Sequence, residues 1–322
     1  MKKMNNAEHI EGRIYQHNLT IRKVQDPASK NYNKEYITGN IEVAVDEDGL
    51  NVIPVHYTFV TEITGKGKPN RNFATLKKII EENKTWVTVG KDEAIKVKID
   101  TALALNDFYD QNDTLVSVKR NEGGFVTIVT DITDKENERN TFNVDMIITG
   151  ATRIEEDPER NIVEQVRIKG GIFDYRNSLL PLDFIVKNPE GMDYFESLEA
   201  SSSDPVFTRV WGNIVCETQT RTVEEESAFG EPAVRTYERK TKEWVVTGTA
   251  KVPYDFGDES ILTADELKKA AQDREVMLAG VKQRSDKYKK SKNVTSTQAT
   301  TTITPAATTI TPAAKTTGTF NF

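Results

Sequence analysis

Aromatic rings and basic side chains alternate near the start of this 322-residue chain, and this pattern points to one kind of chemistry. Tyr32 and Tyr36 lie on either side of Lys34, in a polar loop that leads into a strand-like run. Exposed rings stack on unpaired nucleobases, which contributes about 1–3 kcal/mol per base, and cations follow the phosphates. The pattern therefore indicates a surface for a single-stranded polyanion.

Further rings and cations that suit such a surface occur on predicted strands and loops in both halves of the chain. The full set of candidate nucleic-acid-binding residues is Arg22, Lys34, Tyr36, His56, Lys66, Lys68, Arg71, Tyr109, Lys119, Arg120, Tyr175 and Arg176. All but the last two belong to the first half, which we therefore predict to be the main site.

Several candidates have a plainer interpretation. His56 is equally well explained as an ordinary surface histidine, and the basic segment 66–71 as a solvated loop. Tyr57 and Phe59 alternate with His56 and share a strand face with Val55. Because successive side chains of a strand point to opposite faces, we expect both rings in the core.

Short strands must position these residues. The first half has five strand-like segments, at residues 13–24, 36–45, 51–61, 95–108 and 115–129. Between the third and the fourth, Phe73, Leu76, Ile79 and Ile80 have the spacing of an amphipathic helix. Five strands with one helix in this place are the arrangement of an OB-fold barrel, and a sandwich of antiparallel strands is the alternative.

The second half repeats this order. The matching pairs of segments are 37–41 with 168–172, 54–60 with 181–186, 73–76 with 195–198, 96–99 with 208–211, and 125–129 with 244–247. We predict a mainly β protein of two tandem OB-fold-like, five-stranded barrels. The expected division is a flexible N-terminus (1–10), a first domain (11–130), a second domain (131–256), a C-terminal helix (257–285) and a disordered tail (286–322).

The end of the chain differs in composition from the barrels. Thr263 and Glu266 have the spacing of a capping box, which predicts a helix start. Beyond Ser291 the chain is rich in Thr, Ala and Pro, and residues 301–307 are repeated at 308–314. Such a segment cannot build a core, so we expect a disordered tether that either carries a docking peptide or has no role.

The charge of the chain limits what it binds. The net charge of −7 argues against indiscriminate binding to polyanions. Acidic and basic residues nearly cancel over residues 11–130, whereas residues 131–256 have an acidic excess. If a polyanion binds, the first half is the better host, and the second half is suited to a protein partner.

The sequence carries no signal of catalysis. One cysteine and three histidines give none of the spacings of a zinc site. A phosphate-binding glycine loop and a dinucleotide fingerprint are also absent. We therefore expect a protein that is not an enzyme and holds no metal or cofactor. The lone cysteine suits a reducing cytoplasm, and no apolar run of about 18 residues predicts a membrane span.

Two sets of segments carry a family resemblance. Residues 207–215, an acidic hairpin and residues 234–248 resemble the last two strands of OB-folds that bind single-stranded DNA. The Gly39 strand followed by residues 54–60 is similar to their second and third strands. From residue 11 to about residue 282 the chain resembles a tailed-phage family of single-stranded DNA-binding proteins with tandem OB-folds.

The resemblance implies sequence-tolerant binding of single-stranded DNA in phage DNA replication or recombination, in the cytoplasm of the bacterial host. RNA is an alternative ligand, and a second copy of the chain is an expected partner. Proteins of the wider family end in an acidic tip that recruits replication or recombination proteins, but this chain ends Gly318–Phe322 and shares only the aromatic terminus. The alternative function is a non-enzymatic interaction or structural module of a phage assembly.

Overall fold

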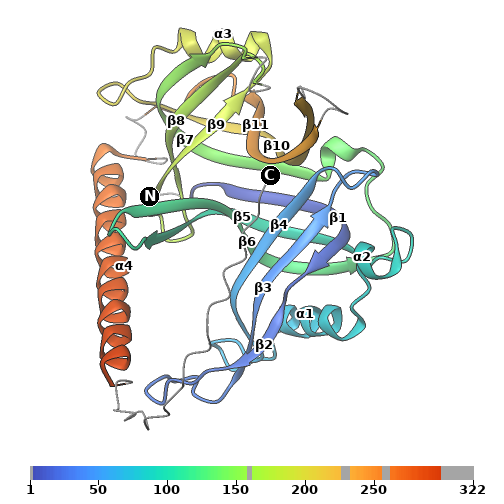
Figure 1. Cartoon of the computed structure of the whole chain (residues 1–322). Coiled ribbons are helices and arrows are strands. Elements are labelled where there is room, and N and C mark those ends of the chain that lie inside the picture. Colours follow the sequence, from blue (N-terminus) through green and yellow to red (C-terminus); the bar gives the residue numbers. More distant parts are fainter. Residues whose placement is uncertain (1–2, 158–161, 226–232, 256–261, 299–322) are drawn as a thin grey trace, which may run out of the picture.

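The structure is a computed structural model that describes residues 3–157, 162–225, 233–255 and 262–298. Its described strands form one sheet of eleven strands that is folded into two barrels. The second barrel lies above the first in Figure 1, and the last helix runs along their left side.

The first barrel closes through five strands. They are β1 (Asn6–His17), β3 (Glu35–Ala44), β4 (Val52–Thr61), β5 (Lys96–Tyr109) and β6 (Leu115–Val129). β1 pairs with β3 and β5, β3 with β4, and β5 with β6, all antiparallel, and a parallel pairing of β4 with β6 closes the ring. Helices α1 (Arg71–Glu82) and α2 (Trp86–Val89) connect β4 to β5.

The second barrel has the same pairing order. Its strands are β7 (Asn140–Ile154), β8 (Gln165–Phe173), β9 (Leu179–Val186), β10 (Val206–Glu225) and β11 (Ala233–Thr249), with α3 (Pro189–Ser197) between β9 and β10. The parallel pair is β9 with β11. This strand order is that of the OB-fold, so the predicted fold class is confirmed.

Alternation of apolar and polar side chains explains why the strands curl around a core. On β3, Ile37, Ile41 and Val43 are fully buried, and the residues between them face outward. Helix α1 begins at Asn70, whose side chain accepts a hydrogen bond from the Asn72 backbone N–H. Its apolar face is buried in the same core cluster as these strands, so α1 seals one end of the first barrel.

The two barrels share a strand junction that the sequence did not predict. β1 pairs with β5 of the first barrel and, over Asn6–Ile10, also with β7 of the second. The expected flexible N-terminus over residues 1–10 is therefore wrong from Asn6 onward. The physical reason is burial, because Glu8 and Ile10 lie in the interior and the Asn6 side chain accepts a hydrogen bond from the Leu103 backbone N–H at 3.0 Å.

The strand expected over residues 13–24 is two separate strands. β1 ends at His17, and β2 (Thr20–Lys23) pairs only with β3, at the edge of the sheet. The chain turns at Asn18, whose side-chain oxygen accepts a hydrogen bond from the Asn40 backbone N–H at 2.6 Å. Gly39 lies against this turn with a φ of 132°, and a Cβ there would lie 2.6 Å from the Asn18 carbonyl oxygen.

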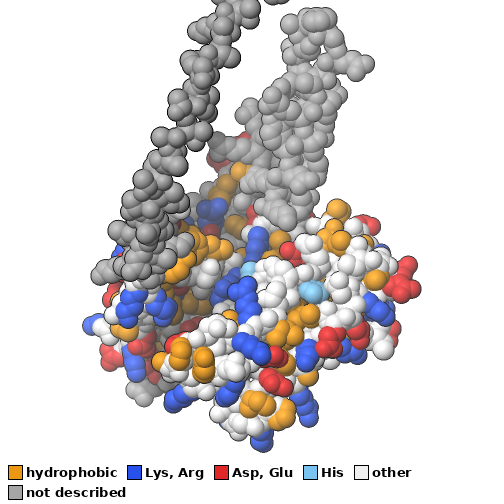
Figure 2. Space-filling model, turned by 60° about the horizontal axis from the view of Figure 1, so that its bottom comes forward, with side chains coloured by type: hydrophobic (Ala, Val, Ile, Leu, Met, Phe, Trp, Pro, Cys, Tyr) orange, Lys and Arg blue, Asp and Glu red, His pale blue; other side chains and the backbone are white. Residues whose placement is uncertain are grey.

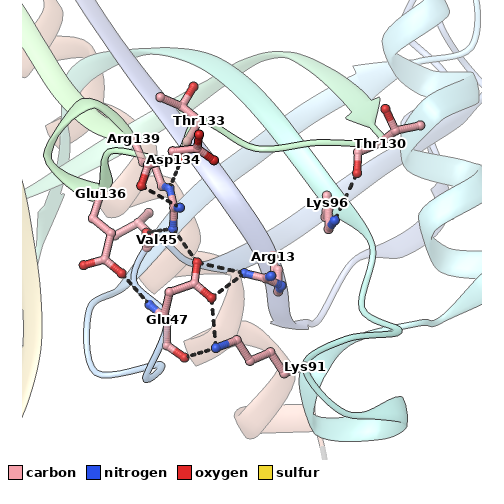
Figure 3. Close-up of polar contacts among 10 residues, drawn as sticks. All are labelled: Arg13, Val45, Glu47, Lys91, Lys96, Thr130, Thr133, Asp134, Glu136 and Arg139. Carbon is pink, nitrogen blue, oxygen red and sulfur yellow. Dashed lines mark hydrogen bonds and ion pairs between the residues drawn. The ribbon is translucent and has the colours of Figure 1, made fainter.

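An ion cluster around Glu47 ties the first barrel to the segment that leads into the second (Figure 3). Glu47 lies in the turn after β3, and its carboxylate contacts Lys91 and Arg139, each at 2.9 Å, and Arg13 at 3.3 Å. Arg139 follows the short 3-10 helix η1 (Glu136–Glu138) and also donates to the Val45 carbonyl at 3.1 Å. The acidic turn is thus a structural anchor.

The C-terminal helix α4 (Ala264–Gln298) is longer than the sequence predicted. The capping box is confirmed, because Glu266 N–H donates to Thr263 Oγ1 at 3.2 Å and Thr263 N–H donates to a Glu266 carboxylate oxygen at 3.0 Å. The predicted end at residue 285 is wrong, since helical backbone continues to Gln298. Residues 256–261 and 299–322, which include the rest of the expected tail, lie outside the described residues.

Helix α4 docks on the β5–β6 hairpin. Arg274 forms a buried, two-point ion pair with Asp107, at 2.5 and 2.7 Å. Because the helix is mostly polar, these contacts and a small apolar cluster fix its position. Among the helices of the described residues, none combines the length and apolar character needed to cross a membrane.

Candidate nucleic-acid interface

The predicted site residues fall into four places on the structure. Arg22, Lys34 and Tyr36 lie together at one end of the first barrel, next to the loop that carries Lys66 and Lys68 and leads to Arg71 at the start of α1. The others lie between the barrels, under α4, or on a turn of the second barrel. Figure 2 shows lysine and arginine side chains in a row across the middle of one face, with hydrophobic side chains beside them.

Two aromatic rings in contact form the centre of the first place. The rings of Tyr36 on β3 and Phe59 on β4 have centroids 4.6 Å apart and planes inclined at 38°. Phe59 is 47% exposed, and Ile21 on β2 and Ile63 after β4 are exposed nearby. We call these four residues, together with Arg22, the Tyr36 patch.

A β-bulge explains why Phe59 is exposed. Ile37 pairs with Val60 and Gly39 pairs with Tyr57, so β4 has one more residue than β3 over this stretch. The extra residue breaks the alternation of faces and turns the Phe59 ring outward. The expected core position of Phe59 is therefore wrong, whereas that of Tyr57, which is 2% exposed, is confirmed.

Unpaired cations surround the Tyr36 patch. Arg22 stands directly opposite Tyr36 in the β2–β3 register. A hollow of about 330 Å³ opens beside the patch, lined by Lys23, Asn33, Lys34, Glu35, Thr61, Glu62 and Ile63. Within the described parts of the chain, Arg22, Lys66 and Lys68 form no ion pair, and the side chains of all three are exposed. Their charges are thus available to phosphates.

His56, Lys119 and Arg120 lie on the side of the first barrel that faces the second. The Lys119 ammonium forms an ion pair with Asp183 of β9 and lies 5.5 Å from the centroid of the Trp244 ring. Arg120 is paired with Glu122 at 2.8 Å. Lys119 is thus held in a contact between the barrels, and Arg120 in an ion pair on its own strand. Both cations are less available to a ligand than those of the Tyr36 patch.

The protonation of His56 follows from the same surroundings. Burial, together with the positive charges of Lys242 and Arg120, lowers the pKa of His56 to about 4. The imidazole is therefore neutral at pH 7 and contributes no positive charge to binding.

Tyr109 and Tyr175 lie apart from the Tyr36 patch. The Lys282 ammonium of α4 lies 4.7 Å from the centroid of the Tyr109 ring, so α4 covers this predicted residue. Tyr175, in the turn after β8, is 79% exposed, and the Arg176 guanidinium lies 5.0 Å from its ring centroid. Tyr175 also lines a hollow of about 610 Å³ between the barrels, together with Arg120.

Several cations of the second barrel are held in ion pairs. Arg153 contacts Glu196 at 2.6 Å, Glu164 at 2.8 Å and Asp193 at 2.9 Å. These carboxylates raise the pKa of Arg153 above its ordinary value and neutralise its charge. Across the described residues, His, Cys, Asp and Glu side chains do not gather in any group of three or more that suits a metal ion.

Sequence reasoning missed Phe59, Ile21 and Phe125 as surface groups. Phe125 on β6 is 69% exposed and lies near Arg71, in a groove between β6 and α1. Both Phe59 and Phe125 sit at register shifts, and a register shift leaves no mark in the alternation of a single strand. The one signal of these register shifts in the sequence is a glycine. Gly39 lies on the strand that pairs with the Phe59 strand, and Gly124 directly precedes Phe125.

Comparisons with known proteins give a family but no close relative. Among curated proteins, none matches the chain. One similar solved structure is a deletion mutant of the single-stranded DNA binding protein from Thermus aquaticus, at 11% identity and a TM-score of 0.45, covering 80% of this chain and 100% of that one. Another is a Replication Protein A heterotrimer bound to single-stranded DNA, at 9% identity and a TM-score of 0.23, covering 84% of this chain and 70% of that one.

Both TM-scores lie below 0.5, so neither likeness indicates what this chain binds. The family assignment is independent of these structures, because it comes from a sequence model that spans most of the described residues. The model of the YorF family matches residues 5–284, and the chain belongs to the YorF family.

Proposed function

We propose that the chain binds single-stranded DNA without sequence preference, with the first barrel as the main site. The observation that carries the proposal is the contacting pair of Tyr36, which is half-buried, and Phe59, which is 47% exposed, with Arg22 opposite Tyr36 and free of any ion pair in the described structure. Exposed rings beside unpaired cations are the combination that holds unpaired bases and their phosphates.

The place of the patch on the fold supports the proposal. An OB-fold presents the outer face of its second and third strands, and the loop between its first and second strands, to oligonucleotides. In the first barrel those strands are β3 and β4, which carry Tyr36 and Phe59, and the loop contains β2 with Arg22. A base stacks on the ring pair while Arg22, Lys34, Lys66 and Lys68 neutralise the phosphates on either side.

The biological setting that we propose is phage DNA replication or recombination in the cytoplasm of the bacterial host, with no catalytic step. The resemblance of the chain to tailed-phage proteins supports this setting. RNA presents bases and phosphates as DNA does. It is therefore a competing ligand, and its affinity relative to that of DNA is to be measured.

Fluorescence anisotropy with a labelled oligo-dT tests the proposal. We expect binding that weakens steeply as salt rises, because each neutralised phosphate releases counterions. Tyr36→Ala is expected to weaken binding by about 5- to 150-fold, which corresponds to one stacked base. Tyr175→Ala is the matched control, because it removes another exposed tyrosine from the second barrel. Absent or salt-insensitive binding of the unaltered chain would contradict the proposal.

A second candidate function is a protein-interaction module. The observation in its favour is that cations of the second barrel, such as Arg153 and Arg209, are already paired with carboxylates. If the chain fails to bind oligo-dT but co-purifies with a phage or host protein, and the acidic second barrel is required, this function replaces the first.

A further inference from the structure

Phe125 is a large apolar side chain that the structure leaves 69% exposed. It lies on β6 in a groove of about 670 Å³ between this strand and α1, on the first barrel. An isolated exposed apolar residue needs no explanation, but this one lies in a hollow that also contains the cations Arg71 and Lys78.

A second β-bulge turns Phe125 outward. Thr101 pairs with Gly123 and Ile99 pairs with Val126, so β6 has one more residue than β5 at this point. Gly124 allows β6 to approach β5 closely at the bulge, since a Cβ there would lie 2.2 Å from the Asp100 carbonyl oxygen. Bulges of this kind redirect a side chain and often lie next to functional sites.

A buried amide holds the bulge in place. The Asn72 side chain, on α1, donates to the Gly124 carbonyl at 2.7 Å and accepts from the Val126 backbone N–H at 3.0 Å. Asn72 is only 8% exposed, so the two backbone groups next to Phe125 are satisfied inside the protein. The outward position of the ring is therefore a fixed feature of the fold.

The charge of the groove suits an anion. Its lining contains Arg71 and Lys78 and no carboxylate, and Lys78 makes one exposed ion pair, with Glu82 at 3.5 Å. By contrast, the hollow between the barrels is lined by Asp100, Glu122 and Asp174 in addition to its cations Lys3 and Arg120. A flat ring next to cations, of which Arg71 forms no ion pair within the described residues, recognises a base and its phosphate.

One loop joins the groove to the Tyr36 patch along the chain. Glu62 and Ile63 line the hollow at the patch, and Arg71 lines the groove, so residues 64–70 connect the two. Asn70 closes this loop, because its side chain donates to the Thr61 carbonyl and its backbone N–H to the Glu62 carbonyl, both at 2.8 Å. Lys66 and Lys68 are exposed on it and offer charges along the way.

We propose that the Phe125 groove is a second stacking subsite for the same DNA strand, which passes from the Tyr36 patch over the Lys66 and Lys68 loop to Phe125. The inference rests on the proposed function. It adds the path of the DNA strand over the first barrel and the minimum oligonucleotide length that occupies both sites. A short oligonucleotide occupies the Tyr36 patch, and a longer one also reaches Phe125.

Affinity as a function of oligonucleotide length tests the subsite. We expect Phe125→Ala to leave binding of oligo-dT of about 4 nucleotides unchanged and to weaken that of about 16 nucleotides by about 5- to 150-fold. Phe125→Tyr keeps a ring and is expected to bind the long oligonucleotide like the unaltered chain. Because Phe125 is exposed, both variants are expected to keep the thermal midpoint, which is measured alongside.

The outcomes separate this inference from the proposed function. If the unaltered chain binds neither length, both fail. If Tyr36→Ala weakens binding but Phe125→Ala matches the unaltered chain at every length, the proposed function stands and the subsite is wrong. Equal loss in Phe125→Ala and Phe125→Tyr, with unchanged thermal midpoints, also overturns the stacking role.

Discussion

The two barrels have the same strand pairings but different outer surfaces. In the first, register shifts expose Phe59 and Phe125, and Arg22 remains free of ion pairs among the described residues. In the second, Arg153 is surrounded by three carboxylates and Arg209 is paired with Asp145 at 2.7 Å. The pairing order therefore sets the fold, while bulges and local charge pairing decide which barrel is suited to a polyanion.

The second barrel also has a register shift near an aromatic ring, but there the ring is covered on one side. Trp211, beside the shift in β10–β11, is 39% exposed. Its ring lies flat against Gly248, where a Cβ would lie 2.4 Å from the indole nitrogen. One side of this ring is thus covered by its own sheet, and the two rings of the Tyr36 patch have no counterpart at Trp211.

The largest expected effect concerns α4, which docks on the hairpin of the first barrel. Arg274→Ala removes the ion-pair partner of the Asp107 carboxylate, whose side chain is 3% exposed and which keeps a hydrogen bond from the Ser117 hydroxyl. Loss of one member of a buried ion pair costs about 3–5 kcal/mol. We expect faster hydrogen exchange throughout α4 and a lower urea midpoint. The control is Lys282→Ala, which removes two exposed ion pairs, with Asp113 and Asp286, and is expected to leave the urea midpoint nearly unchanged. Equal effects of the two variants would contradict the assignment of Arg274 as the anchor.

The second effect concerns the junction of the barrels at Glu8. Its carboxyl group accepts hydrogen bonds from Thr101 at 2.5 Å and from the Trp244 indole N–H at 2.9 Å, so it connects β5 with β11. Burial raises the pKa of Glu8 from 4.5 to about 7. The folded state then holds the proton more tightly than the unfolded state.

Glu8 therefore makes the unfolding free energy dependent on pH. Stability from this group is fully present below pH 4.5 and is lost as the pH rises to about 7, by about 3 kcal/mol. Urea unfolding at pH 5 and pH 8 measures the loss, and Glu8→Gln is expected to flatten it. A variant that keeps the full pH dependence would show that another group is responsible.

The third effect is on the salt dependence of binding. Removing Lys66 and Lys68 together is expected to reduce the slope of log affinity against log salt by about 1 to 2, since single strands give about 0.7 per phosphate contact. Arg153→Ala in the second barrel is the matched control and is expected to leave the slope unchanged. If Arg153→Ala reduces the slope more than the double variant does, the main site lies on the second barrel instead.

The smallest effect is at the ion cluster that joins the barrels (Figure 3). Hydrogen bonds from Lys91 and Arg139 lower the pKa of Glu47 to about 2, from 4.5. Stability from Glu47 is present above pH 4.5 and is lost as the pH falls toward 2. Because the side chain is 43% exposed, we expect Glu47→Gln to cost about 1 kcal/mol or less at pH 7. Thermal midpoints at pH 7 and pH 3 check this, and the difference between variant and unaltered chain should shrink at pH 3.

Much of the fold was predictable from local patterns. Alternating apolar residues such as Ile37, Ile41 and Val43 gave the strands, and the helix slot between the third and fourth strands of each half gave the barrel type. The capping box at Thr263 gave a helix start. These signals lie within a few residues of each other, so the sequence displays them directly.

The features that a single sequence hides depend on partners far away in the chain. Whether Phe59 faces the core depends on its pairing with β3, and whether Lys119 is free depends on Asp183 of the other barrel. The role of Asn6–Ile10 as a strand shared by both barrels depends on β7. In the Tyr36 patch, Arg22 is exposed and Tyr36 half-buried among the described residues, whereas Tyr109 is covered by α4.

Ultraviolet crosslinking of the whole chain to oligo-dT, followed by mass spectrometry of the attached peptides, tests the comparison of the barrels most directly. We expect crosslinks at Tyr36 and Phe59, and at Phe125 with longer strands. Crosslinks concentrated at Tyr175 or Trp211, with none in the first barrel, would contradict the assignment of the Tyr36 patch as the main binding surface.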